Sequence, residues 1–165
     1  PADKRPAAES KFRKEYSDQT KGYQEVKSAY SRLLSSDDNA VGDLSLIFGY
    51  MKMLDPGSVV REGEFATAQN AAGVPERVLN AYNRALNGER LTPAQRSAFK
   101  GQAGKLYSSA QQQEAQVRTG LERIAKGYGL NTSNIFYAPN ETAPMPANDV
   151  NAKAVPGQRN VIVNY

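Results

Sequence analysis

Residues 12–33 read FRKEYSDQTKGYQEVKSAYSRL, and their apolar side chains recur in alternating steps of four and three. This spacing is typical of a heptad-like seam, in which one face of an α-helix packs against a partner helix. The pattern predicts one long helix over residues 7–36. Its seam consists of Phe12, Tyr16, Gln19, Tyr23, Val26, Tyr30 and Leu33, of which only Gln19 is polar.

A second long helix is predicted over residues 92–128. Thr92, Pro93 and Gln95 combine an N-cap hydroxyl, a proline at the first helical position and a glutamine that completes a capping box. Glycines at 127 and 129 end the helix, because glycine readily adopts the backbone conformation that closes a helix. The predicted seam consists of Phe99, Ala103, Leu106, Ala110, Gln113, Val117, Gly120 or Leu121, and Ile124.

Three shorter helices are predicted between the long ones, over residues 41–54, 58–72 and 75–87, with Pro75 in the first turn of the last. The run Asp55-Pro56-Gly57 ends the first of them, because proline cannot continue the hydrogen-bond ladder. That helix is apolar around most of its circumference, which is typical of the centre of a fold or an interface. The predicted inner faces are Leu44, Ile47, Phe48, Met51 and Leu54 in the first short helix, and Val78, Leu79, Tyr82 and Leu86 in the last.

These elements predict an all-α fold. The short helices return the chain, so we expect a helical bundle built on two long antiparallel helices with short helices between them. Matching the two seams end to end places Gln19 near Gln113. We therefore expect a shared polar layer at this level, which would fix the register of the two helices.

The composition changes after Leu130. Residues 131–165 contain four of the nine prolines and few large apolar side chains, so they bury too little surface to fold alone. The sequence predicts a helical domain over 1–130 and an extended Pro-rich C-terminal arm over 131–165. We expect the arm to dock on a neighbouring subunit or another protein, the alternative being that it folds back onto the chain's own helices. The residues expected to dock are Ile135, Phe136, Tyr137, Val161, Ile162 and Val163.

The composition argues against catalysis. The 165 residues include no His, Cys or Trp, so the side chain that titrates near neutral pH and the thiolate nucleophile or metal ligand are both missing. Glu62 and Glu64 stand two positions apart, which places them on different sides of a helix rather than as a paired acid and base. We predict no enzyme activity, no catalytic, cofactor or metal site, and no small-molecule substrate. The longest apolar-rich stretch, residues 44–54, is too short to cross a bilayer.

Charge is segregated along the chain. The net charge is +3 over residues 1–36, −3 over 37–91 and +4 over 92–128. This distribution suits partners of opposite sign, including a neighbouring copy of the chain. Two features of the sequence allow more than one interpretation. The tyrosines spaced by seven form either a packing seam or a ladder on which nucleic-acid bases stack, and we favour packing. A basic cluster forms either a solvated face or a contact with phosphate, and we favour a solvated face. The cluster consists of Lys4, Arg5, Lys11, Arg13 and Lys14.

Residues 42–66, GDLSLIFGYMKMLDPGSVVREGEFA, resemble a segment that recurs in virion proteins of tailed bacteriophages, both internal (DNA ejection) proteins and large structural polypeptides. The similarity continues through residues 73–77 to 91–93 and spans roughly residues 40–125. Some proteins of this kind also carry a peptidoglycan-cleaving domain, but no catalytic glutamate of that type is recognisable in this sequence. The first residue is Pro rather than Met, so we also expect a processed product or a fragment of a longer protein.

The resemblance implies a non-enzymatic virion component, internal or tail-associated, whose partners are other virion proteins or copies of itself. The basic helices leave DNA contact open. Two alternatives remain: a helical nucleic-acid-binding module, and an accessory domain of a phage peptidoglycan hydrolase. The seam residues expected to carry assembly are Phe12, Tyr16, Tyr23, Val26, Tyr30, Phe99, Leu106, Val117 and Ile124.

Overall fold

A computed structural model of the protein describes residues 3–58 and 73–136. Within these ranges the chain forms four α-helices and no strand, which confirms the predicted all-α class. The elements are α1 (Arg5–Leu34), α2 (Ala40–Leu54), α3 (Glu76–Leu86), α4 (Pro93–Gly127) and a 3-10 turn, η3 (Thr132–Asn134). The helix predicted over 58–72 lies outside the described residues except for Ser58, and so do the predicted docking residues Tyr137, Val161, Ile162 and Val163.

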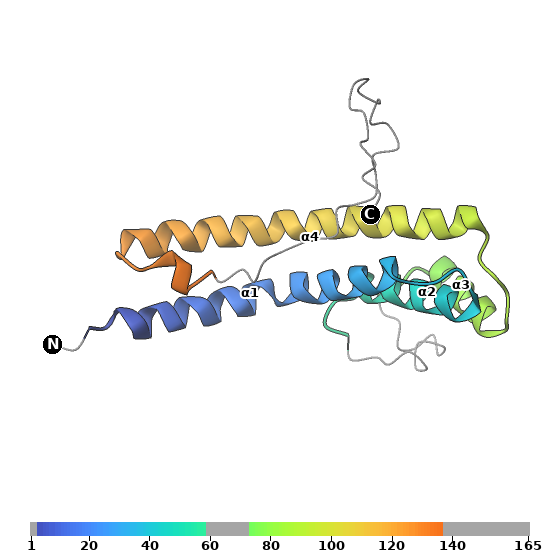
Figure 1. Ribbon diagram of the computed structural model, residues 1–165, viewed down its shortest axis with the longest axis horizontal. Helices are drawn as coiled ribbons and strands as arrows, with labels where there is room; N and C mark the ends of the chain where they lie inside the picture. Colours follow the sequence, from blue (N-terminus) through green and yellow to red (C-terminus); the bar gives the residue numbers. More distant parts are fainter. Residues whose placement is uncertain (1–2, 59–72, 137–165) are drawn as a thin grey trace, which may run out of the picture.

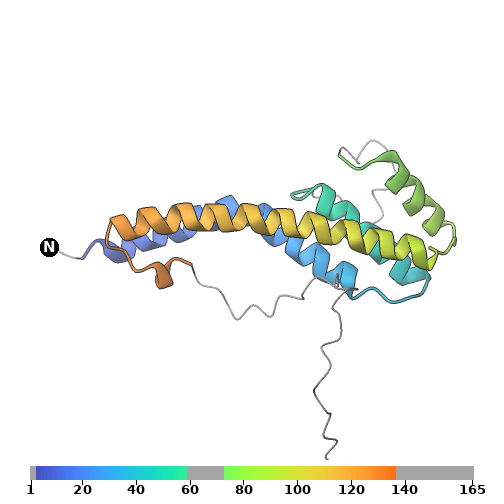
Figure 2. The ribbon, with the colours of Figure 1, turned by 90° about the horizontal axis from the view of Figure 1, so that it is seen from above.

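The two long helices, α1 and α4, run side by side in opposite directions, as predicted (Figure 1). α2 and α3 lie at the end of this hairpin where α1 ends and α4 begins (Figures 1 and 2). η3 lies at the opposite end, between the last turns of α4 and the first turns of α1. The short helices therefore return the chain, which is the arrangement that the sequence predicts.

The helix boundaries follow from local capping. The Thr92 hydroxyl accepts a hydrogen bond from the Gln95 amide, and the Gln95 side chain accepts one from the Thr92 amide, which confirms the capping box. The side chain of Asn39 caps α2 by accepting from the Gly42 amide at 2.8 Å. Pro75 is the N-cap residue of α3 rather than its first helical residue, because its extended backbone (φ −60°, ψ 140°) places it just outside the helix.

Tyrosines form the centre of the contact between α1 and α4. The Tyr107 ring stacks on Tyr30, with ring centroids 4.7 Å apart, and on Tyr23 at 6.2 Å. All three side chains are buried, so those of Tyr23 and Tyr30 serve in packing and are not available for base stacking. Gly104 lies beside this contact, where an added Cβ atom would make an ordinary van der Waals contact with the Tyr30 hydroxyl at 3.5 Å.

The predicted seam of α4 is only partly correct: Ala103 is buried and Phe99, Leu106, Ala110 and Leu121 pack against the apolar clusters, but Gln113 and Ile124 are exposed. The buried positions include Ala103, which was predicted, but also Tyr107 and Ala125, which were not. Ile124 is 47% exposed and Leu86 of α3 is 46% exposed, although both were placed on inner faces. The face of α4 that meets α1 also includes Tyr107, which the predicted seam leaves out. Among the other assembly-seam residues, Tyr23, Val26 and Tyr30 are buried, and Phe12, Tyr16, Phe99 and Leu106 are half-buried and pack against the apolar clusters. Val117 is half-buried.

The predicted glutamine layer is also wrong. Gln19 and Gln113 are both exposed, and the Gln19 amide donates to Glu15 of its own helix. The polar contact between the long helices in this region is made instead by Tyr16, whose hydroxyl donates to the Glu114 carboxylate. Tyr16 belongs to the predicted seam of α1, whereas Glu114 lies one position after the predicted Gln113 in α4. The apolar periodicity alone does not resolve a difference of one residue in α4.

α2 is the central helix of the bundle, since it contacts α1, α3 and α4. Its most deeply buried apolar side chains are Leu46, Ile47 and Met51, all at 0% exposure. The predicted inner face was only half correct, because Leu46, Tyr50 and Met53 are buried while Leu44, Phe48 and Leu54 are half-buried. A helix packed on three sides has no single inner face, as its apolar circumference indicates.

Two glycines of α2 allow the chain to approach closely. A Cβ atom at Gly42 would lie 2.0 Å from the Asp37 carbonyl oxygen, and one at Gly49 would lie 3.1 Å from Leu33 Cβ. We expect Gly42→Ala to lower the free energy of unfolding by about 1–3 kcal/mol, because the turn between α1 and α2 must shift to admit the methyl group. Chemical denaturation measures the change.

Gly22→Ala is the matched control for Gly42→Ala. Gly22 lies inside α1 and has no atom within 4 Å of the added Cβ. Alanine there is expected to raise stability by up to about 1 kcal/mol, because glycine is the weaker helix former. Equal effects at the two positions would contradict the close approach at Gly42.

Candidate functional site

Asp43 is the most deeply buried charged residue in the described ranges, with 0% of its side chain exposed. It lies in the first turn of α2 and accepts hydrogen bonds from Arg90 Nε at 2.6 Å, from the Leu91 amide at 3.1 Å and from Arg96. Burial raises the pKa of Asp43, but the hydrogen bonds from Arg90, Leu91 and Arg96 outweigh burial and hold it below its ordinary value.

The two arginines extend this cluster to the surrounding backbone. Arg96, itself buried, donates from Nη2 to the carbonyl oxygens of Ser36 at 3.1 Å and Asp37 at 2.8 Å. Arg90 also pairs with Asp38 at 2.8 Å. The Asp43 cluster (Asp43, Arg90 and Arg96) therefore joins the α1–α2 turn, α2, the α3–α4 loop and the start of α4. Its buried groups are all used in structural contacts.

A second polar cluster holds the other end of the hairpin. The Glu9 carboxylate accepts from the Asn131 amide at 2.9 Å and from Asn134 Nδ2 at 2.8 Å. Both hydrogen bonds lower the pKa of Glu9, and the one from Asn134 has the larger effect. Arg13 donates to the Asn134 carbonyl oxygen from Nε at 2.9 Å and from Nη2 at 2.6 Å. The Glu9 cluster (Glu9, Arg13, Asn131 and Asn134) thus fixes η3 against α1.

The start of the predicted arm, at Ile135 and Phe136, does not dock on a partner as predicted. Ile135 and Phe136 are 1% and 7% exposed, and they pack within the chain. The Phe136 ring meets Tyr16 edge to face at 5.1 Å, and the Arg118 guanidinium lies 5.8 Å from the Phe136 ring centre. These two residues therefore fold back onto the chain's own helices instead of docking on a partner. The packed unit extends beyond residue 130, at least to Phe136.

The predicted basic cluster is partly used in intrachain contacts. Arg5 pairs with Asp3 at 2.8 Å, and Lys14 pairs with Asp18 at 2.5 Å. Arg13 belongs to the Glu9 cluster, while Lys4 and Lys11 are exposed. This arrangement agrees better with a solvated face than with a phosphate-binding stripe, because three of the five cations already have partners.

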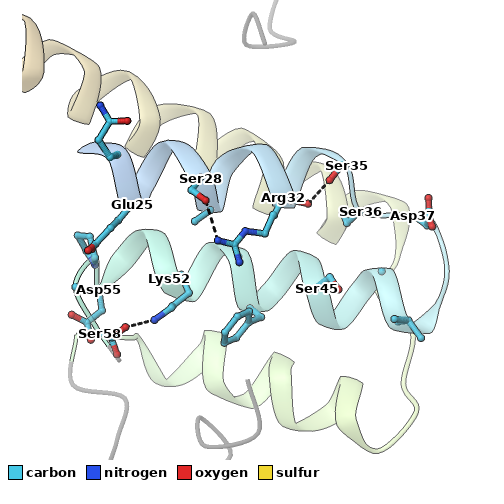
Figure 3. A pocket seen from close by; sticks show the side chains of 18 of the residues that line it. Glu25, Ser28, Arg32, Ser35, Ser36, Asp37, Ser45, Lys52, Asp55 and Ser58 are labelled. Carbon is cyan, nitrogen blue, oxygen red and sulfur yellow. Dashed lines mark hydrogen bonds between the residues drawn. The ribbon is translucent and has the colours of Figure 1, made fainter. Parts of the chain in front are cut away.

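A groove of about 830 Å³ lies between α1 and α2 and continues to the corner after α2 (Figure 3). Cations from both helices line it: Arg32 and Lys21 from α1, and Lys52 from α2. Arg32 Nη2 donates to the Ser28 hydroxyl at 2.9 Å, and Lys52 Nζ donates to the Ser58 carbonyl oxygen. No sequence motif marks this groove, because its lining residues come from two helices.

Other classes of site are not seen in the part of the chain that the structure describes. No group of three or more potential metal-ligating side chains occurs within residues 3–58 and 73–136. None of the helices there combines the length and the apolar character that a membrane span needs. No known protein family, curated protein or solved structure matches the chain.

Proposed function

We propose that the chain is a non-enzymatic component of a tailed-bacteriophage virion, either an internal ejection protein or a tail-associated structural protein. The observation that carries the proposal is the position of α2. This helix opens the run that resembles phage virion proteins, and it is the structural centre of the bundle. The segment that resembles phage virion proteins therefore includes the helix around which the bundle packs. Proteins that assemble into particles can share such a helix without sharing an enzymatic activity.

The use of the buried carboxylates supports the same conclusion. Asp43 and Glu9 both hold backbone segments together, one at each end of the hairpin. A catalytic carboxylate requires a substrate within hydrogen-bond reach. The oxygens of these two carboxylates are instead directed at arginine side chains, an asparagine side chain and main-chain amides.

Purified phage particles provide the test. The protein is expected to remain with infectious particles through density-gradient and size-exclusion purification, at a fixed ratio to the major structural proteins. After ejection is triggered, an internal protein leaves the particle with the DNA, whereas a tail-associated protein stays. Either result supports the proposal, and absence of the protein from purified particles would contradict it.

Two assays with the isolated chain separate the alternatives. Cleavage of purified peptidoglycan would favour the alternative that the chain belongs to a peptidoglycan hydrolase. Binding to double-stranded DNA that weakens steeply as salt is raised, by a protein absent from particles, would favour the nucleic-acid module. The proposed structural component is expected to leave peptidoglycan intact.

A further inference from the structure

The α1–α2 groove combines apolar and charged surface in a space of ligand size. Its volume of about 830 Å³ falls within the range typical of ligand sites. Ala29, Phe48 and Val41 supply apolar surface, and Val41 is 73% exposed although it is aliphatic. An occupant that buries this surface needs apolar groups of its own.

Arg32 and Lys52, two of the cations that line the groove, are not neutralised by carboxylates of the described residues. Among residues 3–58 and 73–136, no salt bridge involves Arg32 or Lys52, whose hydrogen bonds go to a hydroxyl and a carbonyl oxygen. Figure 3 shows the Arg32 side chain extending from α1 across the groove towards α2, whereas the Lys52 side chain points away from it, towards Ser58. An anionic group placed between the two side chains gains two opposite charges and a fork of guanidinium donors.

The ends of the groove carry the opposite charge. Glu25 and Asp55 line one end, and Asp37 lies at the other, as Figure 3 shows. A continuous polyanion such as a nucleic acid is repelled at both ends. A peptide can place a single acidic side chain at the centre, with apolar or basic residues on either side.

We infer that the α1–α2 groove binds an acidic peptide segment of a partner protein, with a carboxylate held by Arg32 and Lys52 and apolar side chains packed on Phe48 and Val41. The inference does not depend on the virion assignment. It names a recognition site, whereas the proposed function names the assembly in which the chain acts.

The full 165-residue chain is titrated with short fluorescein-labelled peptides built of alanine, leucine and serine. The peptides differ only at two central positions, which hold Glu, Gln or Lys. Fluorescence anisotropy is expected to show that the Glu peptide binds at least about tenfold more tightly than the other two, a difference of about 1.4 kcal/mol. Arg32→Glu/Lys52→Glu is expected to reverse the preference, so that the Lys peptide binds best.

Lys11→Glu is the matched control, because Lys11 is an exposed cation of α1 that does not line the groove. It is expected to leave the peptide preference unchanged, and circular dichroism checks that all variants keep their helix content. Equal binding of the three peptides, no measurable binding, or no change of preference in the double variant would overturn the inference. So would displacement of the Glu peptide by double-stranded DNA in a manner that requires Arg32 and Lys52, since the groove would then be a nucleic-acid site.

Discussion

Asp43→Ala is expected to lower the free energy of unfolding by about 3–5 kcal/mol. The substitution removes the nearer carboxylate of the buried Arg96, leaving only Asp38 at 4.0 Å from its Nε, and removes the acceptor of the Leu91 amide. A buried charge that loses its partner keeps its full desolvation cost, which exceeds the value of the lost hydrogen bonds themselves. Urea denaturation followed by circular dichroism measures the change.

The control for Asp43→Ala is Asp18→Ala, which removes an exposed ion pair. Asp18 pairs with Lys14 one turn away in α1, and both side chains are more than half exposed. Such a pair stabilises a helix by only about 0.3–0.5 kcal/mol. A similar loss of stability in both variants would show that the Asp43 cluster does not hold the end of the bundle together.

The stabilisation that Asp43 gives to the folded chain is expected to decrease at low pH. The pKa of Asp43 is lower in the folded chain than in the unfolded chain, where it lies near 3.9. Its stabilisation is therefore fully present above about pH 4–5 and is lost as the pH falls through the folded pKa. The difference in stability between the wild-type chain and Asp43→Asn is expected to shrink below about pH 4, whereas a constant difference would contradict the lowered pKa.

Periodicity and capping were enough to predict the helices, because both depend on residues close together in the sequence. Observed boundaries lie within about two residues of those predicted for α1, α2 and α4, which is the usual uncertainty of helix ends. The capping box at Thr92 was predicted correctly for the same reason: its two hydrogen bonds join residues three apart.

The errors arose where distant residues decide the result. Asp43 belongs to a helix that is otherwise apolar, and its role depends on Arg90 and Arg96, about fifty positions later. A lone acidic residue on an apolar helix is a signal that could have identified the cluster, since a buried charge requires a partner. The groove has no comparable signal, because it exists only after α1 and α2 pack against each other.

The start of the predicted arm was misjudged for a related reason. Proline content over residues 131–165 made the whole segment appear extended. The first six of these residues nevertheless contain Asn131, whose side chain caps η3 by accepting from the Ser133 amide, and two large apolar residues. The composition averaged over residues 131–165 does not reveal this short folded turn at the start of the segment.

Ile135→Ala is expected to lower the free energy of unfolding by about 2–5 kcal/mol, because Ile135 is 1% exposed and the alanine leaves a cavity in its cluster. Ile124→Ala is the matched control: it makes the same chemical change in the neighbouring part of α4, at a side chain that is 47% exposed. We expect Ile124→Ala to change stability by no more than about 0.5–1 kcal/mol. Thermal and urea denaturation at low protein concentration measure the stability of the two variants as monomers.

The pair of isoleucine variants distinguishes intrachain packing from docking on a partner. If Ile135 packs within its own chain, the loss appears in the isolated monomer and does not depend on protein concentration. If Ile135 instead docks on another protein, the monomer is as stable with alanine as with isoleucine, and only assembly is weakened. Equal stability of Ile135→Ala and the wild-type chain would therefore contradict the burial of Ile135 and restore the docking role predicted from the sequence.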